Sequence, residues 1–164
     1  GFFATLEKMG AAMERLNQWD EAGELIGNFK ICHQPLKGII IDENDVPGLI
    51  DELPIIAVLA TQANGKTEVS GAEELRVKEC DRIHALSKNL KKMGADIEEL
   101  QDGFIINGPT PLKGGNIETF HDHRIAMAFT IAGLVTNGDI VLDHPECASI
   151  SFPEFYDVLE NLKQ

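Results

Sequence analysis

The feature that most constrains the fold is a set of three short sequence matches that recur, in the same order, in the two halves of the chain. One four-residue match arises easily by chance, but three matches in one order are much harder to obtain. Such a repeat indicates an internal duplication, in which each copy buries its apolar faces against the other. We therefore predict an α/β protein of two repeated units, at residues 1–71 and 72–164. The matched pairs are Leu6–Ala11 with Leu90–Ala95, Pro35–Gly38 with Pro111–Gly114, and Asn64-Gly65 with Asn137-Gly138.

Helix-like and strand-like patterns alternate through both units. In the first unit they predict a helix at 1–9, a polar loop at Gln18–Asn28, strands at Phe29–Cys32 and Gly38–Ile41, a buried helix at Asp51–Ala63 and a strand at Thr67–Ser70. In the second they predict a helix at Arg82–Met93, strands at Asp96–Glu98 and Gly103–Asn107, a loop at Pro109–Gly115, a strand at Ile117–Phe120, a helix at His123–Val135 and a strand at Ile140–Asp143. The spacing of Ser151 and Glu154 predicts a capping box for a final helix.

Composition and charge limit the kinds of partner. The chain has 164 residues, 43% of them apolar, and a formal net charge of −13. Non-specific nucleic-acid binding needs many cations and is therefore not expected. The longest apolar run, Leu53–Ala60, is too short to cross a bilayer. Three cysteines without close spacing argue against a disulfide framework and for a reducing compartment, so we expect a cytoplasmic protein.

Cations gather at the start of the predicted helix Arg82–Met93. Two cations, Lys78 and Arg82, lie within five positions of the chain, with the carboxylate of Glu79 between them. A helix N-terminus already carries unpaired N–H groups and a partial positive charge. Further cations are unfavourable there for the helix alone, so they indicate a bound anion. The structural alternative is a solvated, charged helix start.

The predicted helix at His123–Val135 begins in a similar way. Asp122 suits the N-cap, and Arg124 again places a cation in the first turn. A planar guanidinium binds phosphate or carboxylate through two hydrogen bonds, so Arg82 and Arg124 are interpreted as partners of one anion. Zinc binding by His121 and His123 is disfavoured because no Cys or third His is suitably spaced. We expect no metal site.

Asp51 occupies the place in the first unit that Arg124 occupies in the second, since 124 − 73 = 51 and the last matched pair is 137 − 64 = 73 residues apart. If the units pack side by side, their helix starts face a common site. A carboxylate near cations can carry a proton, and two carboxylates can divide the acid and base roles. An N-cap alone is the structural alternative for Asp51.

Three segments together resemble 5-enolpyruvylshikimate-3-phosphate synthases, or 3-phosphoshikimate 1-carboxyvinyltransferases. They are Arg76–Ile83, Asp122–Met127 and Ser151–Pro153. The resemblance covers essentially the whole chain, but only the C-terminal two-fifths or so of a usual family member. It implies two lobes, each of three βαβαββ units, with substrates bound between them. The present chain would supply the last two units of one lobe, and an N-terminal lobe of the same polypeptide would supply the opposite wall.

The resemblance implies transfer of the enolpyruvyl group from phosphoenolpyruvate to the 5-hydroxyl of shikimate 3-phosphate, a step of the shikimate pathway of aromatic amino acid biosynthesis, without any cofactor. It implies that Asp51 holds the shikimate hydroxyls and takes the 5-hydroxyl proton, and that Glu79 protonates the methylene carbon. His123 would lie beside the site. The implied substrate contacts are Lys78 to shikimate 3-phosphate, and Arg82 and Arg124 to phosphoenolpyruvate.

Two positions depart from the pattern of this family. Two other functions are also compatible with the sequence. Many members have Lys where this chain has Ile150, and some have Asn where it has Glu74. These departures indicate a distinct subgroup and leave sensitivity to glyphosate-like mimics undetermined. The alternatives are transfer of the same group to UDP-N-acetylglucosamine, and an inert fragment that binds anions weakly. We expect this chain alone to be inactive.

Overall fold

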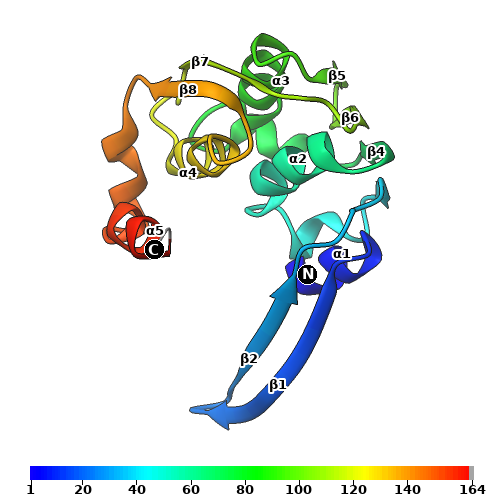
Figure 1. Ribbon diagram of the computed structural model, residues 1–164. Coiled ribbons are helices and arrows are strands. Elements are labelled where there is room, and N and C mark those ends of the chain that lie inside the picture. Colours follow the sequence, from blue (N-terminus) through cyan, green and yellow to red (C-terminus); the bar gives the residue numbers. More distant parts are fainter. Residues whose placement is uncertain (163–164) are drawn as a thin grey trace.

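The computed structural model describes residues 1–162 and confirms an α/β fold (Figure 1). Its first half contains α1 (Phe2–Lys8), β1 (Ala12–Glu21), β2 (Glu24–Cys32), β3 (Ile40–Ile41), α2 (Leu53–Gln62) and β4 (Gly65–Val69). Its second half contains α3 (Arg82–Lys92), β5 (Asp96–Glu99), β6 (Phe104–Gly108), β7 (Lys113–Ile117), α4 (His123–Ala132), β8 (Asn137–Leu142) and α5 (Phe155–Leu162). Short 3₁₀ turns lie at Val46–Gly48, Glu73–Val77 and Pro145–Ile150.

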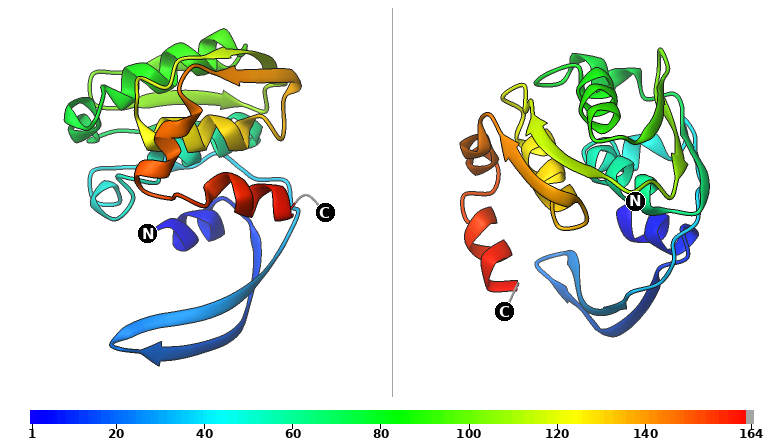
Figure 2. Two further views of the ribbon diagram at one scale, coloured as in Figure 1. Left: turned by 90° about the vertical axis from the view of Figure 1, so that its left-hand side faces the viewer. Right: turned by 45° about the horizontal axis from the view of Figure 1, so that its top comes forward.

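Strands from both halves share one sheet. Its order is β3-β4-β6-β5, with β3 and β4 parallel and the other neighbours antiparallel. Two smaller sheets are the parallel pair β7-β8 and the antiparallel hairpin β1-β2. Helix α3 lies on one side of the strands, α2 and α4 lie on the other, and the hairpin extends away from these layers (Figure 2). No helix within residues 1–162 combines the length and the apolar character needed to cross a membrane.

The core joins the helices of the two halves. Leu53 and Ile56 of α2 are fully buried, as are Ile125 and Phe129 of α4, and these two helices lie side by side. An apolar helix that faces neighbours on most sides is typical of a protein interior. Truncating such a side chain to Ala costs about 2–5 kcal/mol. This packing fixes the relative positions of the helix starts, which is what matters for the site.

Each of the repeated sequence matches occupies an equivalent structural position. The amide of Lys37 donates to the carbonyl of Met9 at 2.9 Å, and the amide of Lys113 donates to that of Met93 at the same distance. The glycines after α1 and α3, Gly10 and Gly94, have φ of 90° and 92°, values that favour glycine at a helix C-terminus. These parallels agree with a duplication, whereas the division at residue 71 stays a prediction.

The predicted loop at Gln18–Asn28 is wrong, because these residues form most of the β1-β2 hairpin. Both strands are largely exposed on both faces, so they lack the alternation of apolar and polar residues by which a half-buried strand is recognised. The true turn is only Ala22-Gly23, whose φ values of 55° and 86° match those of a type I′ hairpin turn.

The predicted limits of the strand at Ile117–Phe120 and of the loop before it are also wrong, because β7 begins at Lys113 and ends at Ile117. Glycine obscured this strand in the sequence. A Cβ atom on Gly114 would lie 2.2 Å from the carbonyl oxygen of Asp139 in β8, so only glycine allows this close approach. The helix predicted to reach Val135 ends at Ala132, and the final helix α5 begins directly after Glu154.

Candidate active site

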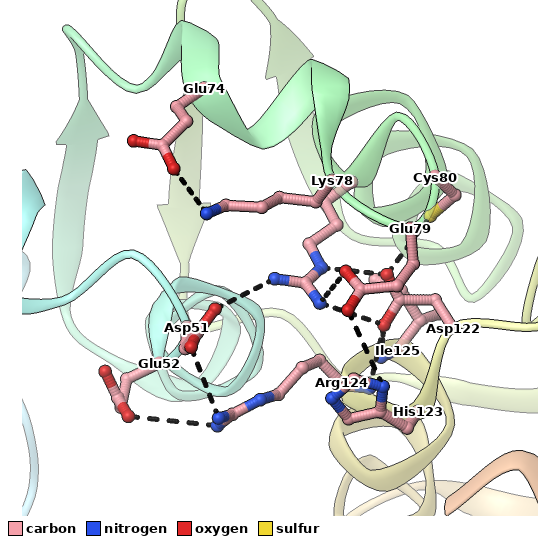
Figure 3. Close-up of polar contacts among 11 residues, drawn as sticks. Asp51, Glu52, Glu74, Lys78, Glu79, Cys80, Asp122, His123, Arg124 and Ile125 are labelled. Atoms are coloured by element: carbon pink, nitrogen blue, oxygen red, sulfur yellow. Dashed lines mark hydrogen bonds and ion pairs between the residues drawn. The ribbon is translucent and has the colours of Figure 1, made fainter. Parts of the chain in front are cut away.

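Three helix starts and one 3₁₀ turn converge on a cluster of charged side chains (Figure 3). Asp51 and Glu52 precede α2, Lys78 and Glu79 lie between the turn Glu73–Val77 and α3, and Arg82 begins α3. Asp122, His123 and Arg124 lie at the start of α4. The structure thus brings together all six residues that the sequence selected, which are Asp51, Lys78, Glu79, Arg82, His123 and Arg124.

Arg82 is held inside the protein by three carboxylates. Its side chain is only 1% exposed. Its Nε donates to Oδ2 of Asp122 at 2.8 Å, its Nη1 to Oδ1 of Asp51 at 3.1 Å and its Nη2 to Oε2 of Glu79 at 2.7 Å. A buried guanidinium requires such partners, because an unpaired charge away from water is costly. Carboxylates of the protein therefore accept hydrogen bonds from all three nitrogens of the Arg82 guanidinium.

Arg124 is more accessible and less tightly held. Its Nη2 donates to Oδ2 of Asp51 at 3.4 Å, and its Nη1 lies 3.8 Å from Oε1 of Glu52. Its Nε is buried and has no hydrogen-bond partner within residues 1–162. Asp51 consequently bridges the two arginines through its two oxygens. The guanidinium of Arg124 retains donor capacity for another acceptor.

Lys78, Glu79 and His123 complete the cluster. Lys78 extends toward Glu74, with which it forms an ion pair, and not toward the arginines (Figure 3). Nδ1 of His123 lies 4.0 Å from Oε1 of Glu79, is itself buried and lacks a hydrogen-bond partner in the described part of the chain. Glu79 is 48% exposed, so its carboxyl group contacts both Arg82 and solvent. An acid that is accessible and lies beside a fixed cation can transfer a proton to a bound molecule.

Asp122 has a second role that the sequence did not reveal. Its Oδ1 accepts hydrogen bonds from the backbone amides of Arg124 and Ile125, at 2.8 and 3.3 Å, which is the expected N-cap. Its Oδ2 accepts from Arg82 and lies 3.5 Å from the thiol of Cys80. Burial, with the Asp122 carboxylate nearby, raises the pKa of the Cys80 thiol to about 12. This thiol therefore stays neutral at physiological pH.

Sequence reasoning also missed Glu52, which lies near Arg124, and the pairing of Glu74 with Lys78. With these included, the ion pairs within residues 1–162 join five carboxylates and three cations in the cluster. The carboxylates are Asp51, Glu52, Glu74, Glu79 and Asp122, and the cations are Lys78, Arg82 and Arg124. An anionic ligand must therefore displace protein carboxylates from Arg82 before it can bind that residue, whereas Arg124 still has donor capacity.

The other histidine near the start of α4, His121, contacts a residue outside the charged cluster. The ring of His121 stacks on that of His144, with centroids 4.0 Å apart. Across residues 1–162, no group of three or more His, Cys, Asp or Glu side chains is placed to hold a metal ion. The three cysteines, Cys32, Cys80 and Cys147, are all unpaired.

A cavity of about 190 Å³ adjoins the charged cluster between α2 and α4. Asp51, Glu52 and Arg124 form its polar end. Apolar side chains of both helices and Phe155 of α5 form the rest. The site is therefore an open, concave surface with its charge at one end.

Comparison with solved structures identifies the class of fold. An EPSP synthase from Acinetobacter baumannii matches with a TM-score of 0.92 and 41% identity, over 97% of this chain and 38% of that protein. The enolpyruvyl transferase NikO from Streptomyces tendae matches with a TM-score of 0.71 over 99% of this chain and 34% of that protein. At 17% identity this second likeness shows the fold alone. The fold is that of the enolpyruvyl transferases.

Sequence comparison identifies the family. The family model for EPSP synthase (3-phosphoshikimate 1-carboxyvinyltransferase) matches residues 1–159. Curated 3-phosphoshikimate 1-carboxyvinyltransferases from a Sulfurihydrogenibium species and from Alkaliphilus oremlandii are 46% and 49% identical to the whole chain. The chain belongs to the EPSP synthase family. It spans 38% of the length of each of these two relatives.

Proposed function

We propose that these residues form part of an enzyme that transfers the enolpyruvyl group from phosphoenolpyruvate to the 5-hydroxyl of shikimate 3-phosphate and releases phosphate. The observation that carries this proposal is the bridge of Asp51 between Arg82 and Arg124, with Glu79 on the same guanidinium. Two arginines suit a substrate that carries both a phosphate and a carboxylate. Two carboxylates beside them suit a reaction that needs an acid and a base.

The contacts of Arg82, Arg124 and Lys78 indicate how substrate binding would prepare the catalytic groups. The anionic groups of phosphoenolpyruvate replace the carboxylates of Asp51 and Glu79 on the two arginines. Asp51 and Glu79 then turn toward the reacting atoms. Lys78 exchanges Glu74 for the phosphate of shikimate 3-phosphate, and His123 stays beside Glu79. The fixed cations stabilise the anionic substrates, and neither a metal ion nor an organic cofactor is required.

The proposed reaction has an addition and an elimination step. In the addition, the 5-hydroxyl oxygen bonds to the central carbon of phosphoenolpyruvate while Glu79 gives a proton to its methylene carbon. Asp51 takes the hydroxyl proton. In the elimination, the carboxylate of Glu79 takes a proton back from the new methyl group, the carbon–oxygen bond to phosphate breaks and the double bond forms again. Asp51 gives its proton to the departing phosphate, so both carboxyl groups return to their starting states.

A second lobe is part of the proposal. The chain spans 38% of its first relatives, and the charged cluster is open to solvent on one side. We propose that an N-terminal part of the same polypeptide closes the site and contributes further substrate contacts. The 164-residue chain alone is then inactive. A cytoplasmic location also belongs to the proposal, and the unpaired cysteines support it.

Phosphate release tests these proposals. The 164-residue chain and the full-length polypeptide are each incubated with phosphoenolpyruvate and either shikimate 3-phosphate or UDP-N-acetylglucosamine, with and without a metal chelator. We expect chelator-insensitive release only from the full-length protein with shikimate 3-phosphate. Release with the UDP-sugar alone contradicts the proposed acceptor. Release by the short chain contradicts the requirement for a second lobe, and no release from either protein supports an inert anion-binding role.

A further inference from the structure

We propose that Asp122 is a positioning residue that sets the direction of the Arg82 guanidinium relative to Arg124 and thereby the affinity for phosphoenolpyruvate. This inference rests on the proposed function. Asp122 is fully buried and lies on α4, whereas Arg82 lies on α3. One carboxylate therefore links the two helices that carry the proposed anion-binding arginines.

The two oxygens of Asp122 have different main partners. Oδ1 accepts from the amides that begin α4, so it fixes the backbone of Arg124 itself, and its contact with Nη2 of Arg82 is longer, at 3.4 Å. Oδ2 accepts from Nε of Arg82 at 2.8 Å. A residue that only capped α4 would need one oxygen. The contact of Oδ2 is with Nε, which is the guanidinium nitrogen bonded to the aliphatic part of the Arg82 side chain.

The contact at Nε determines where the outer nitrogens of Arg82 point. With Nε turned toward Asp122, Nη1 and Nη2 are directed at Asp51 and Glu79, the two exposed carboxylates that a substrate anion would replace. Without Oδ2, a guanidinium that is 1% exposed would have an unpaired buried N–H group and would move to satisfy it. The outer nitrogens would then leave the geometry needed for a shared anion.

Serine separates the two functions of Asp122. Serine caps helices well, but its single oxygen cannot serve both the α4 amides and Arg82. Asp122→Asn is the second variant: it keeps Oδ1 for the cap and presents an amide N–H₂ to Nε of Arg82, where two donors then meet. Asp102→Asn is the matched control, because Asp102 accepts from the backbone amide of Gly71 at 2.8 Å, away from the arginines.

The experiment measures kcat, the KM for each substrate and the midpoint of thermal unfolding in these variants of the full-length protein. For Asp122→Ser and Asp122→Asn we expect the KM for phosphoenolpyruvate to rise about tenfold or more, from the loss of one charged hydrogen bond. The KM for shikimate 3-phosphate should change by less than about threefold, since Lys78 has no contact with Asp122. Asp102→Asn should keep both KM values.

A merely structural role gives a different pattern. If Asp122 has only a structural role, its variants have a lower unfolding midpoint and a smaller fraction of active protein, while both KM values stay within about twofold of wild type. That result in a folded Asp122 variant overturns the inference. If Asp122→Ser does not fold, Asp122→Asn decides the question on the same readouts. A wild-type protein that releases no phosphate refutes the proposed function instead, so the two failures are distinguishable.

Discussion

Replacing each arginine of the site by Met should affect stability very unequally. Arg82 is 1% exposed and has three carboxylate partners, one of which, Asp122, is fully buried. Arg82→Met leaves that buried charge without its cation, which costs about 3–5 kcal/mol. Arg124 is 32% exposed, and its two ion-pair contacts are longer, at 3.4 and 3.8 Å. Arg124→Met should therefore cost about 0.2–1 kcal/mol.

Thermal unfolding of the 164-residue chain, followed by far-ultraviolet circular dichroism, measures this difference. For a chain of this size, each kcal/mol of lost stability lowers the unfolding midpoint by about 2–4 °C. Arg82→Met should therefore lower the midpoint by about 6–20 °C, and Arg124→Met by about 4 °C or less. Both variants replace the same type of residue in the first turn of a helix, so each controls for the other. Equal losses of stability would refute the view that Arg82 is a buried structural cation as well as a binding group.

Four further predictions concern other side chains. In the full-length protein, Asp51→Asn should lower kcat about 100-fold or more without raising the KM for phosphoenolpyruvate, because it removes a proposed proton acceptor together with a competitor for the arginines; a raised KM with unchanged kcat would contradict both roles. Glu74→Gln should lower the KM for shikimate 3-phosphate about two- to fivefold, since Lys78 loses its ion-pair partner, and a higher KM would show that Glu74 assists binding. Iodoacetamide at pH 8 should label the exposed Cys32 and leave Cys80 unmodified by mass spectrometry, because the pKa of the Cys80 thiol is raised to about 12. Because the pKa of this thiol is higher in the folded than in the unfolded protein, its contribution to the free energy of unfolding is full below the ordinary thiol pKa and is lost as the pH rises toward 12. Cys80→Ala should therefore reduce the loss of stability that thermal unfolding measures between neutral and alkaline pH.

Much of the site was predictable because its residues follow local rules that the sequence displays directly. Arg82 and Arg124 are recognisable as cations at helix starts, and the repeat alone predicts that Asp51 lies beside Arg124. The contact between Nη2 of Arg124 and Asp51, 73 residues apart, agrees with that placement. The catalytic and binding roles of these residues stay predictions.

Other features depend on contacts that no local pattern records. The second oxygen of Asp122 meets Arg82, 40 residues away, and N-cap propensity describes only the first oxygen. The hairpin strands at Gln18–Asn28 escape prediction because strands exposed on both faces need no apolar alternation, whereas the strand predicted at Phe29–Cys32 is the end of β2. Strand Lys113–Ile117 was misplaced because the glycines that fit it against β8 are typical of loops in sequence.

The most direct test of the proposed anion site is a structure of the full-length protein with shikimate 3-phosphate and an unreactive analogue of phosphoenolpyruvate. We predict that the phosphate and carboxylate of the analogue lie within hydrogen-bond distance of Arg82 and Arg124, with Asp51 and Glu79 displaced from both guanidinium groups. An analogue bound elsewhere, with Asp51 still bridging the two arginines, would contradict the account.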